Sequence, residues 1–434
     1  MLGRYLDRLD DAQPMQFRGR VQEVTGLVVR AAVPGASIGE LVEIRRSDGH
    51  RLAAEVVGFK DELVVLMPLG SVEGIGPRDE VQATGKPLSI ACGWELLGRV
   101  LDGLGRPIDD GPALRSDTLV EWPIMREAPD PLKRRRITRS LSMGVRAIDG
   151  LLTVGEGQRI GLFAGSGVGK STLMGQIARG SEAEVIVICL IGERGREVRD
   201  FLEEVLGGEG MKRAVVVCAT SDAPSLVRLK SAFVGTAIAE WFRDQGKSVL
   251  LMMDSVTRFA RAQREVGLAA GEPPARQGYP PSVFSMLPRL LERTGNDDRG
   301  SITALYTVLV AGGDMEEPIA DEVRGILDGH IILSRQLASR NHWPAVDVLP
   351  SLSRLMASVA SPEHVKAAGQ FRETLATYES KRDLISLGAY AYGTDEKVDF
   401  AIDLIEELEA LLKQGLNEHT TLDETVERIL DLFG

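Results

Sequence analysis

The most constraining feature of the sequence is a glycine-rich turn between an apolar run and a helix-forming segment, within QRIGLFAGSGVGKSTLM at residues 158–174. Leucine, isoleucine and phenylalanine side chains in residues 158–164 predict a buried parallel strand. A helix is expected to begin near Lys170. Three glycines between strand and helix permit positive φ angles, so successive N–H groups can point at an anion. This stretch therefore predicts a polyphosphate site at a helix N-terminus.

The turn matches the pattern G-x-x-x-x-G-K-[ST] except at its first position, where Ala164 replaces glycine. A methyl group is tolerable there if φ is negative. The pattern predicts that Lys170 reaches the β and γ phosphates and that Ser171 offers its hydroxyl to Mg²⁺. An ordinary glycine-rich turn is the alternative, but the flanking strand and helix favour nucleotide binding. The predicted nucleotide-binding residues of the turn are Gly165, Ser166, Gly167, Val168, Gly169, Lys170, Ser171 and Thr172.

Length and composition restrict the class of protein. The 434 residues are enough for about three domains, and 44% apolar with 26% charged residues is typical of soluble globular proteins. No uninterrupted apolar stretch approaches the roughly 18 residues of a membrane span, and MLGRYLDRLDD has acids where a signal peptide is apolar. We therefore expect a cytoplasmic protein. Three scattered cysteines predict reduced core thiols, at Cys92, Cys189 and Cys218.

Short strands separated by turn residues fill residues 18–88, which predicts a small β-barrel within an N-terminal domain at residues 1–90. Residues 1–90 carry 11 basic and 13 acidic side chains and only three aromatic ones. Nucleic-acid binding needs positive charge and stacking surfaces, so a packing or ring-forming role is preferred. Residues 98–131 are rich in glycine, proline and aspartate and indicate a connecting segment. The basic run at 133–136 favours a solvated or inter-subunit face over a nucleic-acid site.

Apolar strands alternate with helical segments over residues 150–350, which indicates a parallel sheet covered on both faces. Ligands bind such sheets beyond the carboxyl ends of the strands. Asp254 ends the apolar run VLLMMD and is expected to orient Mg²⁺, with a helix cap as the alternative. Glu193 follows another buried strand in IGERGRE and is expected to polarise the attacking water. A salt bridge from Glu193 to Arg194 or Arg196 is the alternative.

Two further features lie toward the end of the chain. Arg354 follows a serine-rich turn in PAVDVLPSLSR and, delivered to a neighbour's nucleotide, would stabilise transition-state charge; by pattern alone it is equally a surface arginine. Residues 361–434 hold 7 basic and 16 acidic side chains, a net charge of −9. Amphipathic helices are expected at 400–412 and from Thr421 onward. A basic partner and a solvated helical face explain this acidity equally well.

Six segments, in this order and spacing, resemble the ATPases of type III protein export in flagellar and injectisome systems, which are relatives of the rotary ATP synthase β subunit. The segments are AGSGVGKST, GERGREV, LLMMDSVTRFARAQRE, GYPPSVFSMLPRLLERTG, DEVRGILDGHIILSR and PAVDVLPSLSR. The resemblance extends from about residue 18 to about residue 400. It implies a RecA-like P-loop ATPase core at residues 91–350, between the N-terminal β-barrel and a C-terminal helical domain at residues 351–434, assembled as a homo-hexamer.

The resemblance also implies roles for particular residues. Lys170 and Ser171 would hold ATP and Mg²⁺, Glu193 would be the general base, and Arg354 would be an arginine finger acting on a neighbouring copy. Trp343 matches the position of a tyrosine that stacks on adenine in the family, with a core aromatic as the alternative. Tyr390 and Tyr392 are weaker candidates for the other side of the adenine pocket.

The function implied by the resemblance is an ATP-hydrolysing motor that energises type III export by releasing and unfolding substrates and chaperones. Expected partners are a coiled-coil stalk protein, a regulator and the membrane export gate, reached from the cytoplasmic side, and no nucleic acid. A catalytic ATP synthase β subunit is an alternative, although GERGREV favours the export family. An RNA-translocating hexamer is disfavoured by the acidic barrel, and a subunit without turnover by Glu193 and Arg354. The shared segments do not separate flagellar from injectisome systems.

Overall fold

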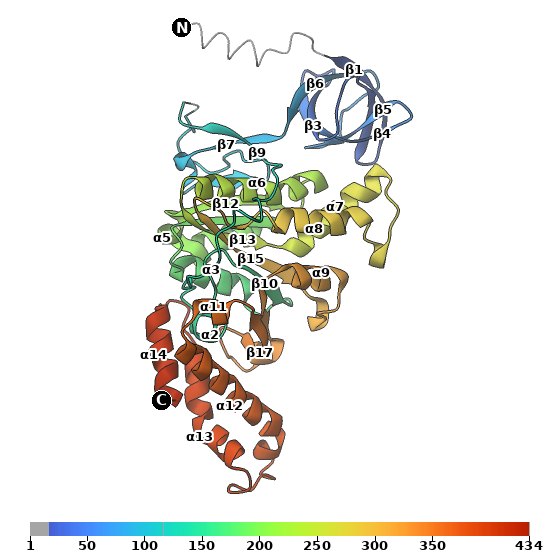
Figure 1. The fold of residues 1–434 in the computed structure, drawn as a ribbon. Helices are drawn as coiled ribbons and strands as arrows, with labels where there is room; N and C mark the ends of the chain where they lie inside the picture. The colour runs from blue at the N-terminus through green and yellow to red at the C-terminus, as the bar shows by residue number, and fades with distance from the viewer. Residues whose placement is uncertain (1–16, 116, 434) are drawn as a thin grey trace.

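A computed structural model describes residues 17–115 and 117–433 (Figure 1). It places a β-barrel at one end of the molecule, a sheet flanked by helices in the middle, and a group of long helices at the other end. The predicted fold class, an α/β core between an N-terminal β-barrel and a C-terminal helical domain, is therefore confirmed. No described helix combines the length and the apolar character that crossing a membrane requires.

The barrel is closed and has the strand order β1-β2-β5-β4-β3-β6. Residues alternate between its interior and its surface, as in β3, because successive side chains of a strand point to opposite faces. An ion pair of 2.6 Å between Glu55 of β4 and Lys230 of helix α6 (Ser225–Asp244) connects the barrel to the central domain. The strands are β1 (Arg18–Thr25), β2 (Val28–Ala32), β3 (Glu40–Arg45), β4 (Arg51–Lys60), β5 (Leu63–Pro68) and β6 (Glu80–Pro87).

The central domain contains a nine-stranded sheet in the order β17-β16-β10-β15-β13-β11-β12-β8, with β14 paired to β15. All ladders along this order are parallel except that of β16 with β17. A separate pair consists of β7 (Ser89–Cys92) and β9 (Val120–Pro123). The strands of the large sheet are β8 (Val100–Asp102), β10 (Arg159–Ala164), β11 (Val185–Glu193), β12 (Ala214–Thr220), β13 (Ser248–Asp254), β14 (Gly295–Asn296), β15 (Ser301–Leu309), β16 (Gly329–Leu333) and β17 (Val346–Ser353).

Both faces of this sheet are buried, as the near-continuous apolar strands predict. In β11, Val187 and Cys189 belong to one core with helix α6, whereas Ile186 and Ile188 belong to a second core with α3 and the C-terminal helices. The connecting segment predicted at residues 98–131 contains more structure than expected, since β8 joins the sheet by pairing with β12. The helices of the domain are α2 (Arg146–Leu151), α3 (Lys170–Gly180), α4 (Gly195–Asp200), α5 (Gly207–Met211), α6 (Ser225–Asp244), α7 (Val256–Ala270), α8 (Pro281–Leu291), α9 (Pro318–Ile326) and α10 (Arg335–Ser339).

The C-terminal domain consists of α11 (Met356–Val359), α12 (Pro362–Ser386), α13 (Glu396–Leu412) and α14 (Leu422–Phe433). The helix predicted at 400–412 lies within α13, and the capping box predicted for the last helix is present. Its two bonds run from Glu424 N to Thr421 Oγ1 at 3.2 Å and from Thr421 N to Glu424 Oε2 at 2.9 Å. The three cysteines are free and buried, as predicted, and burial raises the thiol pKa of Cys92 and Cys189 to about 12.

Candidate active site

The phosphate loop joins the end of β10 to the start of α3. Ala164 is the last residue of β10 and pairs with Leu309 and Leu333, so its extended backbone accommodates the methyl group that replaces the usual glycine. Gly169 has φ 79°, a left-handed conformation that favours glycine. A Cβ built on Gly169 would lie 2.7 Å from the ring of Trp343. Both the backbone angle and this contact therefore require glycine immediately before Lys170.

A cavity of about 550 Å³ opens over this loop at the carboxyl ends of β10, β11 and β15. This is the edge of the sheet at which the sequence predicts ligand binding. Its size is typical of small-molecule sites. It is lined by Ala164, Gly165, Ser166, Gly167, Gly169, Lys170, Ser171, Thr172, Glu193, Arg194, Glu197, Arg258, Arg261, Leu309, Val310 and Ala311.

Lys170, which lines the cavity, lies between two carboxylates. Its Nζ forms an ion pair with Asp254 and is 3.7 Å from Glu193 Oε1. The alternative that Asp254 caps a helix does not hold, because the cap of α7 is the Ser255 hydroxyl, which accepts a bond from the N–H of Arg258. Besides its ion pair with Lys170, Asp254 accepts a hydrogen bond of 2.8 Å from Thr307 Oγ1. The structure thus brings together three residues predicted from separate segments.

Glu193 is buried, and its second oxygen, Oε2, lies 2.8 Å from Arg258. The alternative of a salt bridge to Arg194 or Arg196 is wrong, because Arg194 pairs with Glu197 at 3.5 Å and Arg196 pairs with Asp200 at 3.6 Å.

Burial is the largest cause that raises the pKa of Glu193, and a hydrogen bond with the Glu197 carboxyl raises it further, whereas Lys170 and Arg258 lower it; the net shift is upward. A carboxylate with a raised pKa is a stronger proton acceptor, which suits a general base.

The oxygen donors fit a magnesium ion. The hydroxyl of Ser171 and the carboxylate of Asp254 are hard oxygen ligands, and Ser171 lies in the first turn of α3. Among the described residues, no group of three or more histidines, cysteines, aspartates and glutamates is arranged to hold a metal. Magnesium is usually bound by one or two protein oxygens together with substrate phosphates, so this sparse donor set fits Mg²⁺ with a nucleotide.

Trp343 lies beside the phosphate loop, with its ring against Gly169. It is 39% exposed, so the alternative of a core aromatic is wrong. Its indole N–H donates to Asn341 Oδ1 at 2.9 Å, and its carbonyl accepts from the N–H of Gln414 in the C-terminal domain at 2.9 Å. Tyr390 and Tyr392 do not belong to this site: their hydroxyls bond to Asp399 and Asp403 of α13, in the loop that joins α12 to α13.

Arg354 lies at the opposite edge of the sheet from the phosphate loop of its own chain. Strand β17 is antiparallel to β16, so its last residue, Ser353, pairs with the first residue of β16. The N–H of Arg354 donates to Asp328 O at 3.0 Å, and the N–H of Asp328 donates to Arg159 O, at the start of β10. Because β10 is 6 residues long, about 17 Å of strand separates Arg159 from Ala164. The exposed side chain of Arg354 forms no ion pair or hydrogen bond with the residues described.

Two contributors to the site, Arg258 and Thr307, were not expected from pattern alone. Arg258, the third residue of α7, lines the cavity and forms an ion pair with Glu193. Thr307 is a polar residue within the apolar strand ITALYTVLV. A hydroxyl in a buried strand needs a hydrogen-bond partner, so the threonine in this strand is the sequence signal for the contact between Thr307 and Asp254.

Comparisons with known proteins support the same architecture. Residues 144–353 match the nucleotide-binding domain of the ATP synthase alpha/beta family, residues 21–85 match the beta-barrel domain of that family, and residues 360–431 match the T3SS EscN ATPase C-terminal domain. A type 3 secretion system ATPase of Xanthomonas euvesicatoria is 54% identical over 94% of this chain and 92% of its own length. The chain belongs to the family of type III secretion and flagellar export ATPases.

The flagellar branch of the family is equally close. A flagellum-specific ATP synthase of Bacillus subtilis is 53% identical over 99% of this chain and 98% of its own length. Among solved structures, the assembled ATPase EscN of enteropathogenic E. coli superposes with a TM-score of 0.91 at 46% identity, covering 96% of this chain and all of EscN. EscN in complex with its central stalk EscO superposes with a TM-score of 0.89 over the same share of this chain. The export ATPase hypothesis is therefore confirmed over that of an ATP synthase β subunit.

Proposed function

We propose that this export ATPase is active only at junctions between neighbouring copies, where one copy supplies the phosphate loop and the next supplies Arg354. The observation that carries the proposal is the position of Arg354. It is exposed, it is not engaged by the residues described, and it lies across the sheet from its own phosphate loop. An arginine in that position is available to the cavity of a second copy but not to its own.

Within one cavity, the N–H groups of the phosphate loop and Lys170 would hold the β and γ phosphates of ATP. Ser171 and Asp254 would hold Mg²⁺, which neutralises developing charge on the phosphate oxygens. Glu193, whose pKa is raised by burial, would accept the proton of the attacking water. Arg258 would fix the orientation of Glu193 through their contact of 2.8 Å.

Trp343 would bind the adenine of ATP, since its exposed ring flanks the start of α3. The carbonyl of Trp343 is bonded to Gln414, in the segment that joins α13 to α14. Adenine binding at Trp343 would therefore be coupled to the position of the C-terminal helical domain through this segment.

The assembly we propose is a homo-hexamer, supported by the likeness to EscN in its assembled form. The acidic helical domain would face a coiled-coil stalk, as the complex of EscN with EscO suggests by analogy. The ring would work in the cytoplasm at the inner face of the membrane, with the export gate, a regulator, chaperones and substrates as further partners. ATP hydrolysis there would drive the release and unfolding of substrates.

The concentration dependence of specific activity tests this proposal. Because an isolated copy lacks the second half of the site, ATPase activity per chain should rise with protein concentration, in step with the appearance of hexamers by mass photometry. The variant Arg354→Ala should assemble over the same concentrations but stay at least about 10³-fold less active. Activity per chain that is independent of concentration, at concentrations where only monomers are detected, would refute the proposal.

A further inference from the structure

A second cavity, of about 640 Å³, lies at the opposite edge of the central sheet from the phosphate loop. Ser248, the first residue of β13, lines this cavity, whereas Asp254, the last residue of β13, belongs to the active site. Seven residues of strand, about 20 Å, separate the two ends. The second cavity is therefore distinct from the nucleotide site and is not used by the proposed mechanism.

The charge of this cavity is strongly positive. Five basic side chains line it, against two acidic ones. The basic residues are Arg135, Arg136, Arg139, Lys247 and Arg299, and the acidic residues are Glu156 and Glu184. Two of the basic residues, Arg135 and Arg136, belong to the basic run that the sequence singles out.

Both carboxylates already have partners within the protein. Glu184 accepts bonds from Lys247 Nζ at 2.8 Å and from the N–H of Ser248 at 2.9 Å. Glu156 accepts a bond from Ser301 Oγ at 2.7 Å and lies 3.7 Å from Arg139. These contacts neutralise one lysine and one arginine.

Three guanidinium groups remain, those of Arg135, Arg136 and Arg299. None of them forms an ion pair with a carboxylate among residues 17–115 and 117–433. The hydroxyl of Ser248 also finds no hydrogen-bond partner in that part of the chain. Like charges placed around one cavity repel each other, so this arrangement favours an anion that binds between them.

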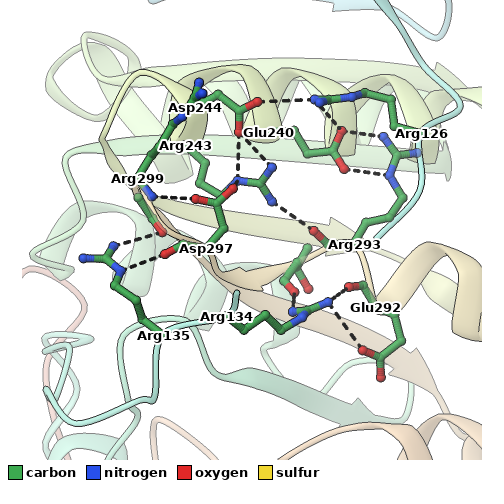
Figure 2. A network of polar contacts seen from close by, with 12 residues as sticks. Arg126, Arg134, Arg135, Glu240, Arg243, Asp244, Glu292, Arg293, Asp297 and Arg299 are labelled. Carbon is green, nitrogen blue, oxygen red and sulfur yellow. Dashed lines mark hydrogen bonds and ion pairs between the residues drawn. The ribbon is translucent and has the colours of Figure 1, made fainter. Parts of the chain in front are cut away.

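A polar network holds Arg135 and the turn that carries Arg299 in place (Figure 2). Arg135 donates to the carbonyls of Asp297 at 2.7 Å and Gly300 at 3.3 Å, which places it against the turn that carries Arg299. The next residue toward the N-terminus, Arg134, donates to Thr294 O at 2.6 Å. The carboxylate of Asp297 forms an ion pair with Arg243, 3.1 Å away, rather than with Arg135.

The same network anchors the preceding part of this segment. Arg293, fully buried, binds both oxygens of Glu240 at 2.8 and 2.7 Å and donates to Ile124 O at 2.6 Å. Arg126 lies 3.7 Å from Glu240 and 3.5 Å from Asp244 (Figure 2). The segment from Ile124 to Arg135 is thus bonded to the central domain at several points. These bonds hold the backbone beside the cavity in place before an anion binds.

We propose that this cavity binds a compact polyanion of the phosphate class. Guanidinium groups bind phosphate oxygens through paired, charge-assisted hydrogen bonds. Three guanidinium groups without a carboxylate partner among the described residues, together with a hydroxyl, match the many oxygens of a diphosphate better than the two oxygens of a single carboxylate. The cavity lies on the same edge of the sheet as Arg354, so an occupant would sit away from the chain's own nucleotide.

Titration calorimetry with inorganic pyrophosphate tests the proposal. The full chain carrying Lys170→Ala serves as the background, because this change weakens binding at the phosphate loop. We expect one saturable site per chain, at least about tenfold weaker for each of Arg136→Ala and Arg299→Ala. Arg136→Lys should have an affinity between those of the background and Arg136→Ala, because it keeps the charge but loses the paired hydrogen bonds of the guanidinium. The matched control is Arg106→Ala, an exposed arginine whose side chain forms no ion pair with the residues described.

Neither Arg136 nor Arg299 bonds through its side chain to the residues described, so the variants should melt at the same temperature as the background. Equal pyrophosphate affinity in the background and in the Arg136→Ala, Arg299→Ala double variant would overturn the proposal, as would the absence of saturable binding. Flotation with phosphatidylcholine vesicles, with and without phosphatidic acid, distinguishes the source of the phosphate. If the protein floats with the vesicles only when they contain phosphatidic acid and both arginines are present, the natural ligand is a lipid headgroup. If the protein binds pyrophosphate but does not float with the vesicles, the ligand is a free anion.

Discussion

Replacing Glu193 by glutamine should abolish turnover while preserving ATP binding. Glu193 is 7% exposed, with one oxygen 3.7 Å from Lys170 and the other 2.8 Å from Arg258. Glutamine has nearly the same volume and keeps an oxygen that accepts the bond from Arg258, so the cavity should retain its shape. It cannot accept a proton from water. General-base catalysis contributes about 10²–10⁴-fold, so kcat should fall by that factor.

The assay is steady-state ATPase activity, together with equilibrium binding of a fluorescent ATP analogue. Glu197→Gln is the matched control, because Glu197 lines the same cavity but is exposed, and within the described part of the chain its ion-pair partner is Arg194. It should retain turnover within about threefold. If Glu193→Gln hydrolyses ATP within threefold of the parent, or binds nucleotide no better than Lys170→Ala, the reasoning about Glu193 is refuted.

The pH profile offers a second test of the same residue. Glu193 must be ionised to act as a base, and its pKa is raised above the ordinary value of 4.5. As the pH falls, kcat should therefore decline at a higher pH than an ordinary glutamate would impose. Glu197 is one cause of the raised pKa, so Glu197→Gln should move the acid limb of the kcat profile to lower pH. An acid limb that moves to higher pH would contradict this account.

Three further changes have defined outcomes. Gly169→Ala should lower ATP affinity at least about tenfold in equilibrium binding, because the methyl group meets the ring of Trp343 in a left-handed backbone; unchanged affinity would show that the loop can rearrange. Trp343→Ala should raise KM for ATP more than it lowers kcat, and Trp343→Tyr should restore KM. An unchanged KM in Trp343→Ala would show that Trp343 does not bind adenine. Glu240→Ala should lower the free energy of unfolding in urea by about 3–5 kcal/mol, because it leaves Arg293 buried and unpaired. The paired change Glu240→Leu with Arg293→Met should recover much of that loss, and equal losses in both would contradict the reasoning.

Much of the site could be predicted from sequence because the carboxyl ends of parallel strands meet at one edge of a sheet. Lys170 follows β10, and Glu193 and Asp254 end β11 and β13, so their proximity needs only the strand assignment. The glycine-rich turn was predictable for a local reason, since its backbone conformation depends on residues next to each other in the chain.

The remaining contacts depend on the order and direction of the strands, which local pattern does not contain. Thr307 reaches Asp254 because β15 lies next to β13, although 53 positions separate the two residues. Arg354 lies across the sheet from its own phosphate loop only because β17 runs antiparallel to β16. The prediction for Tyr390 and Tyr392 failed for the same kind of reason, because the loop that carries them folds against the N-terminal end of α13.

The most direct measurement of the central claim mixes two inactive variants, Arg354→Ala and Lys170→Ala, before assembly. A junction is intact when its phosphate loop comes from the first variant and its arginine comes from the second. In rings assembled at random from equal amounts, about one quarter of the junctions meet this condition, so ATPase activity should reach up to roughly a quarter of the parent value. Activity that stays at the level of the separate variants at every mixing ratio, in rings shown to contain both, would contradict the account.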